Sequence, residues 1–269
     1  MLRNLLKFAS MPLSFTTRPS LVAYLTCGDP DLRTTREIVL AAISAGAEVI
    51  ELGVPFSDPV ADGPVIQRAS ERALRNGVSL EQVLNLAAEI RPESDAGLIV
   101  FSYLNPILRM GFEKFAAQSA EAGVDGALVT DLPVEEADEY LRHMRKRNLA
   151  TVFLAAPTST DDRLKRIATA STGFVYAVSR TGVTGARKDL ADDAQKLVKR
   201  LRKVTKLPIA VGFGISRPEQ FVSVGKFADA AVVGSAIVHT IETNRGKEAE
   251  AVAEWIKQVV GRRSSAVSP

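Results

Sequence analysis

LVAYLTCGDPD, residues 21–31, is the stretch that decides between the two folds that the rest of the sequence allows. Its first six residues are almost continuously apolar, as expected of a parallel strand that is buried on both faces. The turn that follows, TCGDPD (26–31), lacks the Gly-x-Gly-x-x-Gly pattern that opens a doubly wound dinucleotide-binding sheet. This first strand and its loop therefore favour a closed barrel over an open sheet.

The same alternation of short apolar runs and longer amphipathic segments continues along the chain. We predict eight strands, at residues 21–26, 48–53, 97–103, 126–130, 150–156, 174–179, 208–212 and 230–234. Helical patterns lie between them; the segment SLEQVLNLAAEI (79–90), for example, begins with Ser79 and Gln82 at the spacing of a capping box. Eight strand–helix units in about 250 residues predict a (β/α)8 TIM barrel, an α/β fold with one parallel eight-stranded barrel and extra helices.

We expect the barrel to occupy residues 21–262, after an N-terminal extension or capping segment at 1–20 and before a flexible tail at 263–269. The opening residues, MLRNLLKFASMPLSF (1–15), contain an apolar stretch that Asn4 and Lys7 interrupt, which argues against a secretory signal. An amphipathic helix that covers part of the core is the preferred interpretation. Alternatively, Met11 is the true start and the first ten residues are an upstream extension.

Composition excludes several classes of protein. The 269 residues carry 34 basic and 31 acidic side chains, a balance that argues against a nucleic-acid partner. A single cysteine, Cys27, excludes an internal disulfide and a cysteine-rich zinc site, and two histidines exclude a multi-histidine metal site. No apolar run approaches the roughly 18 residues that span a bilayer. We therefore expect a cytoplasmic protein with no metal and no membrane partner.

Glycine-rich loops follow the last three predicted strands: SRTGVTGARKD (179–189), GFGIS (212–216) and GSAIV (234–238). Glycine lets backbone N–H groups approach an anion closely, and a helix N-terminus adds a favourable dipole. In TIM barrels, phosphate commonly binds at the loops after strands seven and eight. The predicted phosphate-binding residues are Gly185, Gly214, Gly234 and Ser235, although each glycine taken alone could merely turn the chain.

Three carboxylates occur in VIELGVPFSDPVADGP (49–64), at the end of the second predicted strand and in its loop. If Glu51 points into the barrel, burial raises its pKa and lets it exchange protons near neutral pH. The alternative is a structural carboxylate bonded to loop amides. By position alone, Asp62 could cap the following helix and Asp58 could form a turn. The residues by themselves leave these roles open.

One longer stretch, IELGVPFSDPVADGPVIQRAS (50–70), resembles the signature of the tryptophan synthase alpha subunit family. The resemblance extends over nearly the whole barrel, through VAYLTCGDPD, SYLNPI, GVDGALVTDLPVEEA, YAVSRTGVTGAR, VGFGIS and VVGSAIV. It implies a carbon–carbon lyase that cleaves indole-3-glycerol phosphate to indole and glyceraldehyde 3-phosphate in tryptophan biosynthesis, with no cofactor in this chain. The match does not extend to the segment before Leu21, where Pro12 and Pro19 stand in the usual helical lead-in.

The resemblance also implies a role for each acid. Glu51 would be the mobile general acid–base, and Asp62 would hydrogen-bond the indole N–H and stabilise its developing positive charge. Thr184, in the lid segment SRTGVTG (179–185), would contact Asp62 when the lid closes. The apolar walls around the indole would be formed by Tyr24, Ile99 or Phe101, Tyr176 and Phe213.

A partner is implied as well. Pro55, Asp58 and Pro133 map to loops that would face a beta subunit in an α2β2 heterotetramer, and that subunit would hold pyridoxal phosphate and join indole to serine. Activity would then depend allosterically on the partner. Two alternatives remain: another indole-pathway barrel such as indole-glycerol-phosphate synthase, and a non-catalytic activator of the beta subunit. The first would be supported by a lysine at a strand end, which is missing, and the second is opposed by the intact Glu51 and Asp62.

Overall fold

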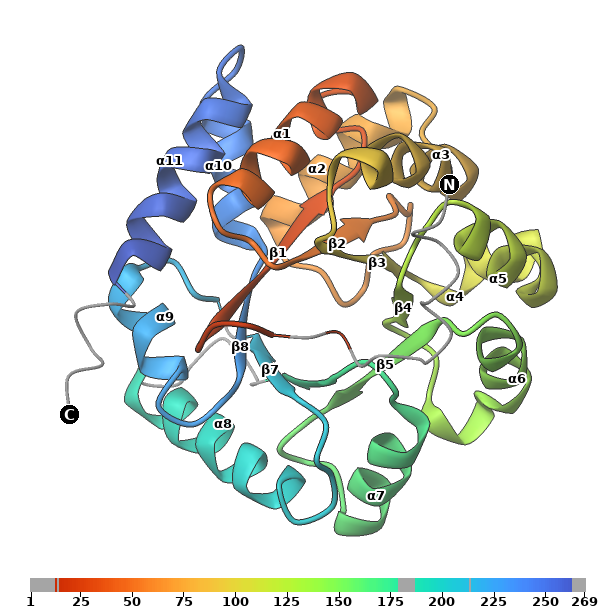
Figure 1. Cartoon of the computed structure of the whole chain (residues 1–269), viewed down its shortest axis with the longest axis vertical. Coiled ribbons are helices and arrows are strands. Elements are labelled where there is room, and N and C mark those ends of the chain that lie inside the picture. Colours follow the sequence, from red (N-terminus) through yellow and green to blue (C-terminus); the bar gives the residue numbers. More distant parts are fainter. Residues whose placement is uncertain (1–12, 14, 179–186, 213, 263–269) are drawn as a thin grey trace.

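Eight parallel strands close into a barrel, and the helices form a ring around it (Figure 1). A computed structural model describes residues 13, 15–178, 187–212 and 214–262. Each strand pairs with the next one in the sequence, and β8 pairs with β1. The strands are β1 (Ser20–Thr26), β2 (Val49–Gly53), β3 (Gly97–Ser102), β4 (Gly126–Val129), β5 (Ala150–Ala155), β6 (Val175–Val178), β7 (Ile209–Gly212) and β8 (Ala230–Val233). The predicted TIM barrel is confirmed.

The predicted strands differ from those observed by at most one residue at either end, and residue 179, where the sixth was expected to end, lies outside the described residues. The capping box at Ser79 is present. The described helices are α1 (Leu32–Ser44), α2 (Pro64–Arg75), α3 (Leu80–Ile90), α4 (Leu104–Met110), α5 (Phe112–Glu121), α6 (Asp138–Lys146), α7 (Asp161–Ala170), α8 (Arg187–Leu201), α9 (Pro218–Val224), α10 (Ser235–Thr243) and α11 (Glu248–Val260), with 3-10 turns η2 (Arg91–Glu93) and η3 (Val134–Glu136).

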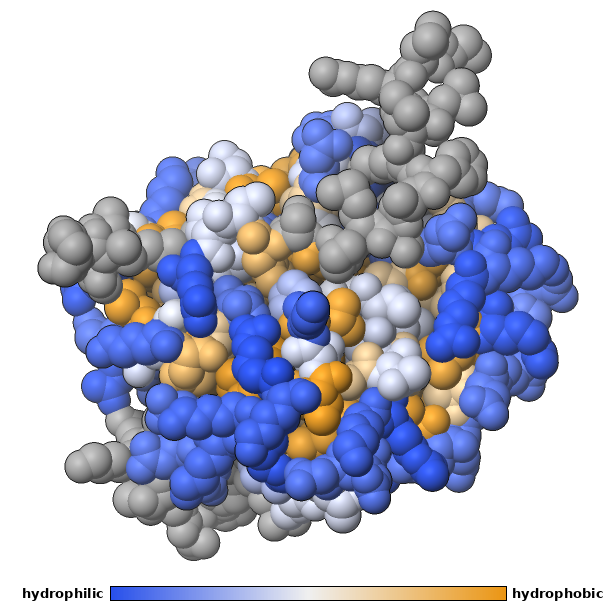
Figure 2. All heavy atoms as spheres, turned by 60° about the horizontal axis from the view of Figure 1, so that its bottom comes forward, coloured by the Kyte–Doolittle hydropathy of each residue, from blue (hydrophilic) through white to orange (hydrophobic). Residues whose placement is uncertain are grey.

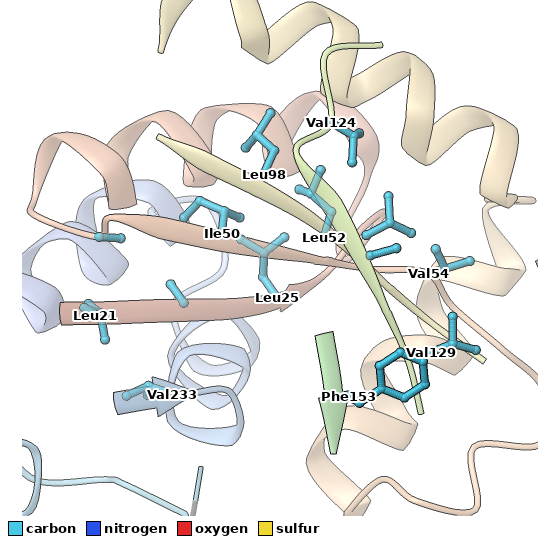
Figure 3. Packing of buried hydrophobic residues seen from close by; sticks show 14 of the residues in the cluster. Leu21, Leu25, Ile50, Leu52, Val54, Leu98, Val124, Val129, Phe153 and Val233 are labelled. Atoms are coloured by element: carbon cyan, nitrogen blue, oxygen red, sulfur yellow. The ribbon is translucent and has the colours of Figure 1, made fainter. Parts of the chain in front are cut away.

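Alternation along the strands divides the core into two layers. Ile50 and Leu52 of β2 belong to the outer cluster between the strands and the helices, and Figure 3 shows them beside Leu25 of β1. Val49 belongs to the inner cluster inside the barrel. Because successive side chains on a strand point to opposite faces, Glu51 shares the inner face with Val49.

The segment before β1 closes one end of the barrel. Leu13 and Phe15 pack on the inner cluster, and the rings of Phe15 and Phe174 lie with their centroids 5.7 Å apart. Gly97 makes room for this plug, since a Cβ there would come within 2.8 Å of the Leu13 side chain. Residues 1–12 and 263–269 lie outside the described residues, so the expected helix at the start, the tail and the division of the chain stay predictions.

Hydrophilic residues cover much of the face that Figure 2 shows, with smaller apolar areas between them. Across the described parts of the chain, none of the helices is long and apolar enough to cross a membrane. The exposed large apolar side chains include Val60 and Leu108. Val60 follows β2 and Leu108 follows β3, so both lie at the carboxyl end of the strands, where TIM barrels carry their active sites.

Candidate active site

Glu51 is a fully buried carboxyl group on the inner face of β2. Its neighbours across the sheet are Tyr24 of β1 and Ile99 of β3. Neither carboxylate oxygen has a hydrogen-bond partner among the described residues, so the alternative of a structural carboxylate bonded to loop amides finds no support there. Burial raises the pKa of Glu51 to about 8. Such a group can both give and take a proton at neutral pH.

Asp62 lies in the loop between β2 and α2, and it does not cap the helix. The N-cap is Gly63, whereas one carboxylate oxygen of Asp62 accepts a hydrogen bond of 3.1 Å from the Tyr103 hydroxyl. Burial raises the pKa of Asp62 to about 6, and the hydrogen bond from Tyr103 acts in the opposite direction. The N-cap interpretation is therefore wrong, because the carboxylate turns toward Tyr103 at the end of β3.

Tyr103 is a site residue that the sequence reasoning missed. It directly follows the last residue of β3, and its hydroxyl oxygen also accepts a hydrogen bond of 3.0 Å from the Ala61 backbone N–H. Its ring lies against Phe56, with centroids 5.1 Å apart. The available signal was its place at the carboxyl end of a strand, where TIM barrels carry functional groups.

Aromatic rings stand next to the two acids. The ring of Tyr24 meets that of Phe101 edge-on, with centroids 4.9 Å apart. Burial is the main cause that raises the pKa of the Tyr24 and Tyr176 hydroxyls, and both carboxylates, Glu51 and Asp62, raise these pKa values further. Both phenols therefore lie within electrostatic reach of both acids. The structure therefore brings together five of the predicted residues at the carboxyl end of the strands, which we call the mouth of the barrel: Tyr24, Glu51, Asp62, Phe101 and Tyr176.

Two glycines at strand ends make room for these rings. A Cβ on Gly212, at the end of β7, would lie 2.3 Å from the Tyr176 hydroxyl, and a Cβ on Gly53, at the end of β2, would lie 2.6 Å from the Tyr24 hydroxyl. Gly212 opens the loop GFGIS, in which we had predicted Gly214 for phosphate binding and Phe213 for the indole wall but had given Gly212 itself no role. In the structure Gly212 makes room for Tyr176, because only a residue without a side chain lets the Tyr176 ring lie across the end of β7.

The predicted phosphate loops are partly described. Gly234 is the N-cap of α10, which begins at Ser235 as expected, and Ser235 is exposed. The backbone N–H groups of a first helical turn lack helical partners and suit an anion. Gly214 is exposed with a φ of +59°, which favours glycine. The other predicted residues of this end and of the lid lie outside the described residues: Thr184, Gly185 and Phe213.

The three residues expected at a partner interface lie on loops at the same end of the barrel. Asp58 is exposed and Pro133 is half-buried, whereas Pro55 is buried in the single chain. Asp58 accepts a hydrogen bond of 2.6 Å from the Ser57 hydroxyl. In the described part of the chain, no group of three or more His, Cys, Asp or Glu residues is placed to hold a metal ion.

Comparison with known proteins shows the family. The family model for the tryptophan synthase alpha chain matches residues 12–267, so the match begins before Leu21, where we had not expected it to extend. The chain belongs to the tryptophan synthase alpha chain family. This membership confirms the predicted family, and it makes the chain an alpha chain of tryptophan biosynthesis and a lyase.

Relatives of the tryptophan synthase alpha chain family match along most of the chain. The alpha chain of Solibacter usitatus is 54% identical over 84% of this chain and 85% of its own. That of Neisseria meningitidis serogroup B is 47% identical over 89% and 92%. Among solved structures, the alpha subunit of Legionella pneumophila superposes with a TM-score of 0.84 at 35% identity, covering 92% and 93% of the two chains. A chain of the tryptophan synthase complex of Pyrococcus furiosus superposes with a TM-score of 0.82 at 39% identity, covering 91% and 98%.

Proposed function

We propose that the chain cleaves indole-3-glycerol phosphate to indole and glyceraldehyde 3-phosphate, with Glu51 and Asp62 as its catalytic residues. Family membership supports the reaction. The observation that carries the assignment of residues is the buried carboxyl group of Glu51, which has no hydrogen-bond partner among the described residues and lies beside Tyr24 and Tyr176. A buried carboxyl group without a partner is costly to the fold, and such a cost is typical of a functional group.

Glu51 moves the protons in this mechanism. With its pKa near 8 it is mostly protonated at neutral pH, and it donates its proton to C3 of the indole to form an indolenine cation. The resulting carboxylate then takes the proton of the hydroxyl group on C1′. As the C1′ carbonyl forms, the electron pair of the C3–C1′ bond returns to the ring. Glu51 ends protonated again, so the cycle balances without a cofactor.

Asp62 stabilises the charge that this proton transfer creates. Its pKa near 6 leaves it mostly ionised at neutral pH, and its carboxylate would accept the indole N–H while that nitrogen carries positive charge. Tyr103 holds the carboxylate in place. Tyr24, Phe101 and Tyr176, together with Phe213, would form the walls around the indole ring, and Thr184 would contact Asp62 from the lid.

The phosphate group would bind at the opposite side of the mouth. The backbone N–H groups at the start of α10, with the Ser235 hydroxyl, would donate to its oxygens, and the helix dipole would favour its charge. Gly234, Gly214 and Gly185 would let the backbone approach. The ring of Tyr24 lies next to this helix start, since a Cβ on Gly234 would be 3.3 Å from it.

We further propose that indole passes to a pyridoxal-phosphate-containing beta subunit in a cytoplasmic α2β2 heterotetramer. The solved tryptophan synthase complexes among the relatives support the partnership. The loops that carry Pro55, Asp58 and Pro133 would face that subunit. This chain itself would bind no cofactor.

Indole release from indole-3-glycerol phosphate by the purified chain, with and without a beta subunit, tests the reaction. Glu51→Gln should lower kcat by at least about 10³-fold, because the proton donor is lost. The control is Glu48→Gln, since Glu48 lies one residue before β2 and bonds to Thr16 and Thr17 instead. Near-normal turnover by Glu51→Gln would remove Glu51 from the mechanism. Stimulation of a beta subunit by a wild-type chain that releases no indole would instead support the non-catalytic activator.

A further inference from the structure

A network of ion pairs lies outside the mouth described above and ties α2 to α10. Arg72 of α2 binds Asp29 through two hydrogen bonds of 2.8 and 2.7 Å, and a third bond of 2.9 Å joins it to Glu242 of α10. Arg68, one turn earlier on α2, binds both oxygens of Glu242 at 2.8 and 2.7 Å. Glu242 therefore binds both Arg68 and Arg72, whereas the third arginine of α2, Arg75, pairs with Glu71.

This network of ion pairs holds α2 and α10 in a fixed position relative to each other. Asp29 is buried, and Arg245 also reaches it at 3.2 Å, so its charge is compensated from two sides. Bidentate arginine–carboxylate pairs hold both position and orientation, and a partly buried network contributes more than isolated surface pairs do. Arg68 and Arg72 hold the pKa of Glu242 near 2, so this carboxylate stays charged over the whole working range of pH.

Both tied helices begin at the mouth. α2 starts at Pro64, two residues after Asp62, and α10 starts at Ser235, in the proposed phosphate site. The two helices also pack directly, since Ala69 of α2 and Val238 of α10 lie with Tyr24 in one small apolar cluster. The spacing of the two helices therefore sets the spacing between Asp62 and the start of α10.

We propose that Glu242 is a positioning residue that, by holding Arg68 and Arg72, fixes the distance between the indole end and the phosphate end of the site. The inference rests on the proposed function, because Asp62 and Ser235 must contact opposite ends of one substrate molecule. A ligand that spans both ends needs the correct spacing, whereas a ligand that occupies one end does not. Misplacement by about 1 Å can cost up to about 10²-fold in rate.

The test compares ligands that span the site with ligands that do not. Dissociation constants are measured for indole-3-propanol phosphate, which carries both ends and cannot react, and for indole and inorganic phosphate alone. In Glu242→Gln we expect the first constant to rise about tenfold and the KM of the substrate to rise with it. The constants for indole and phosphate should change less than about twofold. Because Asp29 keeps both of its arginines, this variant leaves no buried charge without a partner.

Arg68→Met is the second variant, because Arg68 is half-exposed and its loss should not prevent folding. The matched control is Arg91→Met. Arg91 binds Asp125 at 2.8 Å and three backbone carbonyl oxygens, but it follows α3 and lies near the start of β3, at the other end of the barrel. We expect Arg91→Met to lower the midpoint of thermal unfolding. It should not weaken binding of the spanning ligand more than binding of indole or phosphate alone.

Two results would overturn the inference. One is an equal rise in the dissociation constants of all three ligands in Glu242→Gln and Arg68→Met, which would indicate that these two residues have a structural role only. The other is unchanged affinity for the spanning ligand in both variants. Failure of the proposed function is recognised separately, because then the wild-type chain itself neither binds the spanning ligand nor releases indole.

Discussion

Tyr103 and Asp62 are joined by a hydrogen bond of 3.1 Å from the tyrosine hydroxyl to one carboxylate oxygen. The bond connects the end of β3 to the loop after β2, and it opposes the effect of burial on the pKa of Asp62. The Tyr103 ring also lies against Phe56, so Tyr103 contacts the loop after β2 at a second place. The position and the charge of Asp62 thus depend on the residue that directly follows the next strand.

Tyr103→Phe should move the acidic limb of the pH profile. The ring and its contact with Phe56 are kept, but the donor that favours ionised Asp62 is lost, so the pKa of Asp62 should rise from about 6 by up to about one unit. The measurement is kcat/KM for indole release between pH 5 and 9. Tyr140→Phe is the control, since the Tyr140 hydroxyl donates to the Ala127 carbonyl oxygen away from the acids. An acidic limb that stays in place in Tyr103→Phe would contradict the coupling.

The wild-type chain should show a bell-shaped profile of kcat/KM against pH. Asp62 acts as a carboxylate, so activity should rise with pH through about 6, where this group ionises. Glu51 acts first as an acid, so activity should fall as pH rises through about 8, where it loses its proton. A flat profile across this range would be incompatible with these two roles.

Glu51→Gln should stabilise the fold at alkaline pH. The carboxyl pKa is raised from 4.5 to about 8 by folding, so between these values the folded chain holds a proton that the unfolded chain has lost. The free energy of unfolding of the wild type therefore falls as pH rises through this window. At 1.36 kcal/mol per pKa unit, the loss approaches about 5 kcal/mol above pH 8.

Urea unfolding at pH 5 and pH 8.5 measures this effect. The advantage of Glu51→Gln over the wild type should be larger at pH 8.5, whereas Glu48→Gln should not gain stability with pH in this way. An advantage that does not grow with pH would show that Glu51 is not buried as an uncompensated acid.

Gly212→Ala should disturb the indole pocket without breaking the barrel. A Cβ at this position would lie 2.3 Å from the Tyr176 hydroxyl, so the ring must shift from its place near Glu51. We expect kcat/KM to fall on the order of tenfold, mainly through KM. The control is Gly261→Ala, where an added Cβ meets nothing within 4 Å. Wild-type kinetics in Gly212→Ala would show that Tyr176 does not shape the pocket.

Local pattern in the sequence predicted the barrel closely. Apolar runs such as 21–26 must be buried on both faces, and their ends are marked by residues that cannot continue a strand. The alternation along 49–52 likewise predicted that Glu51 shares a face with Val49, and the structure shows that this face is the inner one. The resemblance to the family then named the reaction, and the match over residues 12–267 confirmed the family.

Other features depend on contacts between residues that are far apart in the chain. Nothing near Asp62 in the sequence indicates that its carboxylate accepts a hydrogen bond from Tyr103, 41 residues later, and does not cap the helix that follows. Nothing near Gly212 indicates that the ring of Tyr176 covers it.

The sequence by itself therefore determined the strands and the alternation that puts Val49 and Glu51 on one face of β2 and Ile50 and Leu52 on the other, because periodicity and strand ends are local properties. Only the tertiary structure decided the partner of Asp62, the room for the aromatic rings and the tie between Arg72 and Glu242, which lie 170 residues apart. The physical reason is that hydrogen bonds and packing act over a few ångströms in space, and closure of the barrel sets which distant residues meet.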